Sequence, residues 1–190
     1  MAINLQKGQR VSLDGSMKLA LVGLGWDVNQ FETGGNYDLD ATAFLLGAND
    51  KLILDSDFVF YNNLNARNGA VVHQGDNLTG AGEGDDEVII IDFSKIPDEI
   101  QKIAICVSIY DESKRLTFGQ VSNAFVRVAK LSNEFDTVGE DQLRFDLGEE
   151  FSIETAVLVC EIYRYNGEWK FNAVGTGYSG GLEALVNKYH

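Results

Sequence analysis

Apolar and polar side chains alternate along much of this chain, and this period of two limits its fold more than any other feature. In a strand, successive side chains point to opposite faces of the sheet. Across residues 37–46, YDLDATAFLL, the odd-numbered residues would form an apolar face, while Asp38 and Asp40 share the other. Such alternation is typical of strands with one face against a core. The sequence therefore predicts a protein built mainly of strands.

Glycine, asparagine and aspartate must form most of the turns, because the chain has 20 glycines and only one proline. These residues tolerate the positive φ angles that tight turns between strands require. The clearest case is Asn166-Gly167, which separates two strand-like segments, residues 152–165 and 168–175. Asn-Gly is a strong signal for a type I′ turn, so we expect a β-hairpin here.

Helical signals are few and short. Residues 94–99 and the start of residues 118–128 read as helical turns, and residues 180–189 read as a short helix that packs Leu182 and Leu185 onto the body. No linker divides the 190 residues, and turn signals recur at the spacing usual for a sandwich. We expect one domain, residues 1–190: a mainly-β sandwich of two packed sheets with short helical turns and a short C-terminal helix.

The charge balance excludes several partners. The chain has 15 Lys and Arg against 29 Asp and Glu, a net charge of −14, which disfavours nucleic acid and anionic membrane surfaces. The run Val88–Ile91 is far too short to cross a bilayer, and the N-terminus lacks the apolar segment of an export signal. Cys106 and Cys160 lie in apolar segments, where we expect buried free thiols. A cytoplasmic protein without direct membrane insertion is predicted.

Acidic residues concentrate in two stretches that contain no Lys or Arg, between Lys18 and Lys51 and between Arg67 and Lys95. The second stretch includes the glycine-rich loop GDNLTGAGEGDDE, residues 75–87, which ends in three consecutive carboxylates. Like charges at about 4–6 Å oppose each other's ionisation, and a counter-ion removes that conflict. The alternative is a solvated loop with no ion.

The side chains available decide which ion would suit such a site. Carboxylate, amide and carbonyl oxygens are the ligands of Ca²⁺, whereas zinc prefers His or Cys. The chain has only two histidines, His73 and His190, and we expect His73 to be a hydrogen-bonded loop or edge residue. An oxygen-ligand divalent site is therefore predicted, with Asp38 and Asp40 as a second acidic group near the loop.

Six separated blocks of the sequence resemble the TerD family of tellurium-resistance and stress-response proteins. The blocks are INLQKGQRVSL (3–13), YDLDATAFLL (37–46), DFVFYNNL (57–64), GDNLTGAGEGDDE (75–87), FGQVSNAFVRV (118–128) and YRYNGEWKFNAVGTGYSGGL (163–182). The resemblance extends over nearly the whole chain. It implies a β-sandwich that binds one or two Ca²⁺ ions and acts in bacterial stress response.

The same resemblance implies a set of metal ligands in the DLD, YNN and GDNLTGAGEGDDE blocks. Side-chain oxygens are expected from most of them, and backbone oxygens from two glycines. The residues carried over are Asp38, Asp40, Asn62, Asn63, Asp76, Asn77, Gly82, Gly84, Asp85, Asp86 and Glu87.

Two functions remain open at this point. The first is a Ca²⁺-ordered scaffold or sensor, associated with tellurite resistance and partnered by stress-response proteins of the same operon type. The second is a Ca²⁺-dependent module that binds a small molecule or nucleotide. Catalysis is not expected, because the sequence contains no P-loop, H-E-x-x-H or C-x-x-C pattern.

Overall fold

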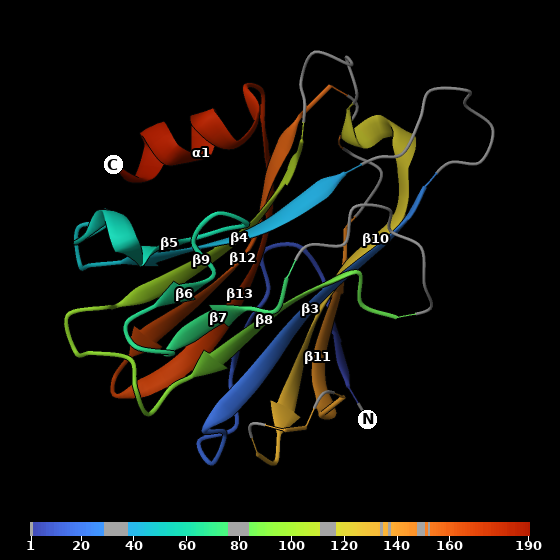
Figure 1. The fold of residues 1–190 in the computed structure, drawn as a ribbon. Helices are drawn as coiled ribbons and strands as arrows, with labels where there is room; N and C mark the ends of the chain where they lie inside the picture. Colours follow the sequence, from blue (N-terminus) through green and yellow to red (C-terminus); the bar gives the residue numbers. More distant parts are fainter. Residues whose placement is uncertain are drawn as a thin grey trace.

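The computed structural model describes residues 2–28, 38–75, 84–110, 117–133, 135–136, 138–147, 151 and 153–190. Two β-sheets pack face to face, and one α-helix lies against the outside of the second sheet (Figure 1). The predicted mainly-β sandwich with a C-terminal helix is thus confirmed. No helix in these ranges is long and apolar enough to cross a membrane.

Sheet A has seven strands and sheet B has six. In spatial order, sheet A consists of β1 (Ile3–Leu5), β11 (Glu140–Asp146), β10 (Val121–Leu131), β3 (Leu19–Val28), β8 (Glu87–Asp92), β7 (Val71–His73) and β6 (Asn65–Ala66). Sheet B consists of β2 (Arg10–Ser12), β13 (Glu168–Tyr178), β12 (Ala156–Tyr165), β9 (Lys102–Ile109), β4 (Leu39–Leu46) and β5 (Phe58–Val59). The short helices are η1 (Asp55–Asp57), η3 (Phe118–Gln120) and α1 (Gly181–Tyr189).

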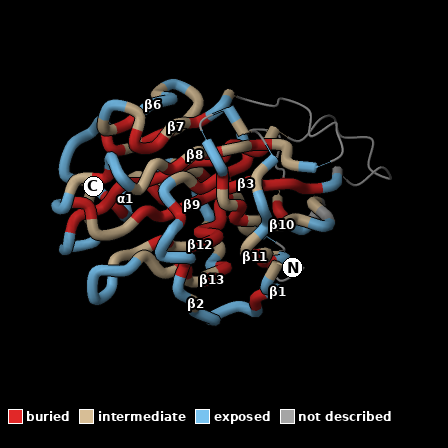
Figure 2. Tube along the Cα trace, turned by 90° about the horizontal axis from the view of Figure 1, so that it is seen from below, coloured by how far each residue is buried: buried red, intermediate tan, exposed pale blue. Residues whose placement is uncertain are grey.

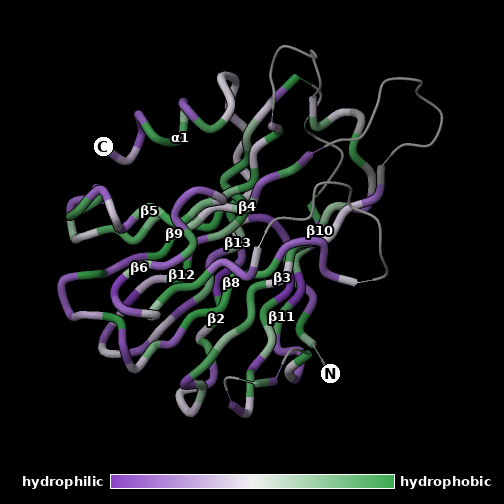
Figure 3. Tube along the Cα trace, in the orientation of Figure 1, coloured by the Kyte–Doolittle hydropathy of each residue, from purple (hydrophilic) through white to green (hydrophobic). Residues whose placement is uncertain are grey.

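The alternation in β4 separates two apolar layers, whereas the sequence predicted only one apolar face, and all eight residues of the strand are buried. Leu39, Ala41, Ala43 and Leu45 belong to the core between the sheets. Phe44 and Leu46 belong to a second cluster, which α1 covers with Leu185 and Tyr189. Figure 2 shows buried residues along the central strands and exposed residues mainly on the connections, and in Figure 3 α1 alternates between apolar and polar residues.

The local turn signals are also confirmed. β12 and β13 form an antiparallel hairpin around Asn166 and Gly167, whose φ angles are 51° and 81°. Both turn residues therefore have the positive φ of a type I′ turn. A helical turn was predicted at the start of residues 118–128, and η3 is found there, followed by β10.

The strand β11, which begins at Glu140, was not predicted. Two expectations from the sequence were wrong. Residues 94–99 form turns without a helix. His73, expected in a loop or at an edge, is buried in β7 between β6 and β8.

The two cysteines behave as expected. Cys106 and Cys160 are free and fully buried, in β9 and β12. Burial in apolar surroundings raises the pKa of both thiols well above its ordinary value. Neither side chain is therefore a ready nucleophile or reductant.

Candidate metal-binding site

Glu87, the first residue of β8, joins the two sheets at the acidic end of the sandwich. Its side chain is 1% exposed, and its Oε2 accepts a hydrogen bond of 2.6 Å from the backbone N–H of Ala41 in β4. Ala41 directly follows the DLD motif, residues 38–40. The structure therefore brings the end of the glycine-rich loop beside the DLD motif, although the two lie 46 residues apart.

His73 supports Glu87 from the neighbouring strand. Its Nε2 lies 3.2 Å from Oε2 of Glu87, and its Nδ1 accepts a hydrogen bond of 3.1 Å from the N–H of Gly75. Because Nδ1 is an acceptor, a neutral His73 carries its proton on Nε2 and donates it to Glu87. The sequence offered no signal for this contact, because it depends on the register in which β7 pairs with β8, where His73 lies opposite Ile89.

Asp86 lies where several negative charges meet. Its Oδ2 accepts a hydrogen bond of 2.9 Å from the backbone N–H of Trp26. Burial raises the pKa of this carboxyl, and the charges of Asp27, Asp85 and Glu87 raise it further, against the opposing effect of the Trp26 hydrogen bond. The carboxylate of Asp86 is thus under the electrostatic influence of three other carboxylates, and a cation would relieve that effect.

Asp85 differs from Asp86 because an arginine neutralises it. Arg127 in β10 donates from Nε to Oδ1 at 2.8 Å and from Nη2 to Oδ2 at 2.6 Å. The carboxylate lies over Gly23 of β3, where a Cβ would stand only 2.2–2.3 Å from it. Gly23 therefore leaves the space that this ion pair occupies. Arg127 lies 42 residues from Asp85, and sequence reasoning missed it.

Two further contacts bring the DLD and YNN blocks together. The backbone oxygen of Asp38 accepts a hydrogen bond of 2.8 Å from the N–H of Tyr110. The ring of Tyr110 meets that of Tyr61 edge to face, with centroids 5.7 Å apart, and Tyr61 directly precedes Asn62. Three of the predicted blocks, which are distant in sequence, thus lie in one region of the fold.

Within those blocks, the predicted ligands have different surroundings. Asp40 is 3% exposed and in register with Ser108 of β9. Asn62 is exposed, whereas the amide of Asn63 donates to the backbone oxygens of Phe58 and Ser56. Asn63 thereby closes the turn after β5, and its side-chain oxygen is the atom that could face an ion.

The ligand set is only partly described. Asp76, Asn77 and Gly82 lie outside the described residues, while Gly84 has a φ of 115°. Among the described residues, no group of three or more His, Cys, Asp or Glu side chains lies close enough together to hold a metal ion. A complete coordination sphere would therefore need oxygen atoms from residues 76–83 or from water.

One sequence pattern associated with catalysis is present between the last strand and the C-terminal helix. Residues 177–181, GYSGG, fit the G-x-S-x-G pattern of a nucleophile elbow and lie between β13 and α1. Ser179 is exposed, and no hydrogen bond joins its hydroxyl to a histidine or carboxylate of the described residues. Within that part of the chain, no base is placed to activate this serine.

Comparison with known proteins identifies the family. A family model described as the TerD domain matches residues 1–189. The chain belongs to the TerD family. It is 49% identical over 193 residues to the tellurium resistance protein TerD of Serratia marcescens, covering 100% of this chain and 97% of that relative. Over the same lengths it is 49% identical to general stress protein 16U of Bacillus subtilis (strain 168).

A further relative is an uncharacterised protein of Bacillus subtilis (strain 168), YceE. It is 57% identical over 193 residues, which cover 100% of this chain and 98% of YceE. Among solved structures, a TerD homologue from Streptomyces coelicolor A3(2) covers 90% of this chain and 96% of its own length, with a TM-score of 0.71 and 21% identity. At that identity the likeness supports the TerD-like fold alone.

Proposed function

We propose that this TerD-family protein is a non-catalytic, calcium-binding stress-response protein that acts in tellurite resistance. One observation carries the proposal: the consecutive carboxylates Asp85, Asp86 and Glu87 end the loop beside the DLD motif, and the charges of Asp27, Asp85 and Glu87 raise the pKa of Asp86. Carboxylates brought together in this way gain from a hard dication with oxygen ligands. The names of the relatives support the stress and tellurium role.

The donor set fits Ca²⁺ better than a transition metal. The predicted ligands offer carboxylate, amide and backbone oxygens, and His73 uses both ring nitrogens within the fold. We propose that Asp86 and Asp40 supply carboxylates, together with Asp38, Asp76, Asn77 and the backbone oxygens of Gly82 and Gly84. Asp85 would instead anchor the end of the loop through Arg127.

The ion would act by supplying positive charge. Its binding to the folded state alone would stabilise the protein by about 2.7 kcal/mol at a concentration 100 times the dissociation constant. One or two ions would order the loop of residues 75–87 and so present a surface to a partner. We propose a cytoplasmic scaffold or sensor of this kind, with stress-response proteins of the same operon type as partners.

Thermal unfolding tests this proposal. The melting temperature would be measured in EDTA, in Ca²⁺ and in Mg²⁺, for the wild type, Asp86→Asn and the control Asp146→Asn, which removes an exposed acid paired with Arg144. We expect Ca²⁺ to raise the melting temperature of the wild type and of Asp146→Asn, but much less that of Asp86→Asn. Equal melting temperatures in EDTA and Ca²⁺ for the wild type would contradict calcium binding.

Fluorescence gives a second readout of the same site. The chain has two tryptophans, and the backbone of Trp26 bonds to Asp86, whereas Trp169 packs against Phe93 with tilted rings. In a Trp169→Phe variant, Trp26 is the sole reporter. Its emission should change on Ca²⁺ addition and return to the starting value with EDTA.

A second candidate function has one observation in its favour. Tyr110 is 49% exposed and, with Tyr61, forms an aromatic pair beside Asp38. Such a pair next to a cation would suit a small molecule with a planar part and an anionic group, such as a nucleotide. Calorimetry with nucleotides should then show binding that needs Ca²⁺, and binding unchanged by EDTA would exclude this function.

A further inference from the structure

The outer faces of the two sheets differ in how they are covered. Helix α1 covers an apolar cluster on sheet B with Leu182, Leu185 and Tyr189. On the outer face of sheet A, a third apolar cluster centres on Leu21 and Leu131, and no described helix covers it. A hollow of about 650 Å³ lies over this cluster. We call it the outer groove.

Strand register explains why the floor of the outer groove is apolar. Leu21 of β3 pairs with Ile90 of β8, and Ile90 with Val72 of β7. These three residues line the groove and form one apolar row across three neighbouring strands. At about 4.8 Å between strands, the row is roughly 10 Å long. A row of this length matches about six residues of an α-helix, which rises about 1.5 Å per residue.

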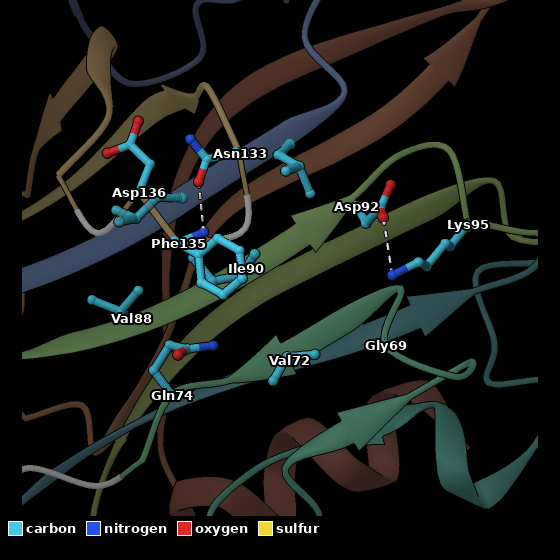
Figure 4. A pocket seen from close by; sticks show the side chains of 12 residues that line it. Gly69, Val72, Gln74, Val88, Ile90, Asp92, Lys95, Asn133, Phe135 and Asp136 are labelled. Carbon is cyan, nitrogen blue, oxygen red and sulfur yellow. Dashed lines mark hydrogen bonds and ion pairs between the residues drawn. The ribbon is translucent and has the colours of Figure 1, made fainter.

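The turn between β10 and β11 forms one wall of the groove. Phe135 projects from this turn and lines the groove together with Ile90 and Val88, and its side chain is 83% exposed (Figure 4). Asp136 fixes the turn, since its carboxylate accepts hydrogen bonds from Ser132 and from the backbone N–H of Gly139. A large aromatic ring is thereby held open to solvent by a well-bonded turn.

The charges at the rim are mainly negative. Asp92 lies at one end of the groove, where Lys95 approaches it at 3.2 Å, and Asp136 lies on the wall (Figure 4). Burial opposes ionisation of Asp92, but hydrogen bonds from Ser94 and Lys95 outweigh it and lower its pKa. The hydrogen bond from Gly139 and those from Ser132 lower the pKa of Asp136. Both groups stay charged at neutral pH.

We propose that the outer groove is the docking site for a cationic amphipathic helix of another protein. Its apolar stripe would lie on the row from Leu21 to Val72 and against Phe135, as α1 lies on the outer face of sheet B. Lys or Arg beside the stripe would meet Asp92 and Asp136. A net charge of −14 favours such a partner and opposes a second copy of this chain.

Designed peptides test this proposal without a known partner. The probe is an 18-residue fluorescent peptide with Leu at helical spacing and Lys elsewhere, compared with a scrambled peptide of the same composition and with a version carrying Glu in place of Lys. Binding is measured by anisotropy at physiological salt, in EDTA and again in Ca²⁺. We expect the amphipathic Lys peptide to bind at least tenfold more tightly than either control peptide.

Protein variants then locate the binding. Phe135→Ala removes an exposed ring, and Ile90→Lys places a charge on the groove floor. Each should weaken binding of the amphipathic peptide at least fivefold, while the control Ile53→Lys, at an exposed residue on the η1 side, should leave it unchanged. Melting curves check that each variant is folded. If Ile90→Lys does not fold, the result for Phe135→Ala decides the test.

Three results would overturn the proposal. The scrambled peptide could bind as tightly as the amphipathic one, which would show only attraction between opposite charges. Phe135→Ala and a folded Ile90→Lys could both bind normally. Sedimentation could instead reveal a dimer that Phe135→Ala dissociates, which would identify a second copy as the occupant. None of these results depends on calcium binding, so the two proposals fail separately.

Discussion

Replacing Arg127 by methionine tests whether the ion pair with Asp85 anchors the end of the glycine-rich loop. The side chains of Arg127 and Asp85 are only 16% and 8% exposed. Breaking a buried pair by removing one partner costs about 3–5 kcal/mol, whereas an exposed pair contributes about 0–1 kcal/mol. Because the guanidinium partly reaches solvent, we expect Arg127→Met to lower the free energy of unfolding by about 2–3 kcal/mol.

Thermal and urea unfolding measure this loss. For a chain of this size, about 2–4 °C per kcal/mol predicts a fall in melting temperature of roughly 4–12 °C. Arg127 also donates to Asp141 and to the backbone oxygen of Val138, so a double-mutant cycle with Asp85→Asn is needed to isolate the Asp85 contact. We expect a coupling energy of at least about 1 kcal/mol.

The matched control is Arg144→Met. Arg144 bonds to Asp146 at 2.8 Å, but these side chains are 40% and 66% exposed, so its loss should cost at most about 1 kcal/mol. If Arg127→Met melts within 2 °C of the wild type, about the same as the control, the buried pair does not stabilise the loop end. Strictly additive effects of Arg127→Met and Asp85→Asn would also refute the argument.

Three further predictions follow from the packing and the charges. Cys106 and Cys160 should not react with a thiol reagent in the native protein, and two thiols per chain should react after unfolding, because both are fully buried; rapid native labelling would contradict this. Phe44→Ala should lower the free energy of unfolding in urea by about 3–5 kcal/mol, because Phe44 is 0% exposed. A loss below about 1 kcal/mol would show that the layer under α1 adapts to the smaller side chain. By NMR, the pKa of Asp14 should be about 2, because Lys130 donates to its carboxylate, and Lys130→Gln should raise it towards 3.8. Since the folded pKa lies below the unfolded one, the stabilisation by Asp14 is present above pH 3.8 and is lost as the pH falls through about 2.

The parts of the fold set by local sequence could be predicted. β4 follows directly from its alternation, and the β12–β13 hairpin follows from Asn166 and Gly167, because only a turn with two positive φ angles suits that pair. β11 was not recognised, since its sequence EDQLRFD is mostly polar. Leu143 and Phe145 face the core, and pairing with β10 and β1 makes the segment a strand.

The candidate site could be predicted only in composition. The sequence shows that carboxylates gather near residues 85–87, but neighbouring acids have different partners: Asp85 bonds to Arg127, Asp86 to Trp26 and Glu87 to Ala41. Each partner comes from another strand, so the choice depends on how the sheets pack. The spacing of residues along the chain does not determine that packing.

A crystal structure of the protein grown with Ca²⁺ tests the central claim most directly. Anomalous scattering would locate the ion and distinguish it from water. We predict an ion beside Asp86, with oxygen ligands at about 2.3–2.6 Å that include Asp86 and residues of the loop 75–87. If crystals grown in millimolar Ca²⁺ contain only water beside Asp86, the calcium-binding account is wrong.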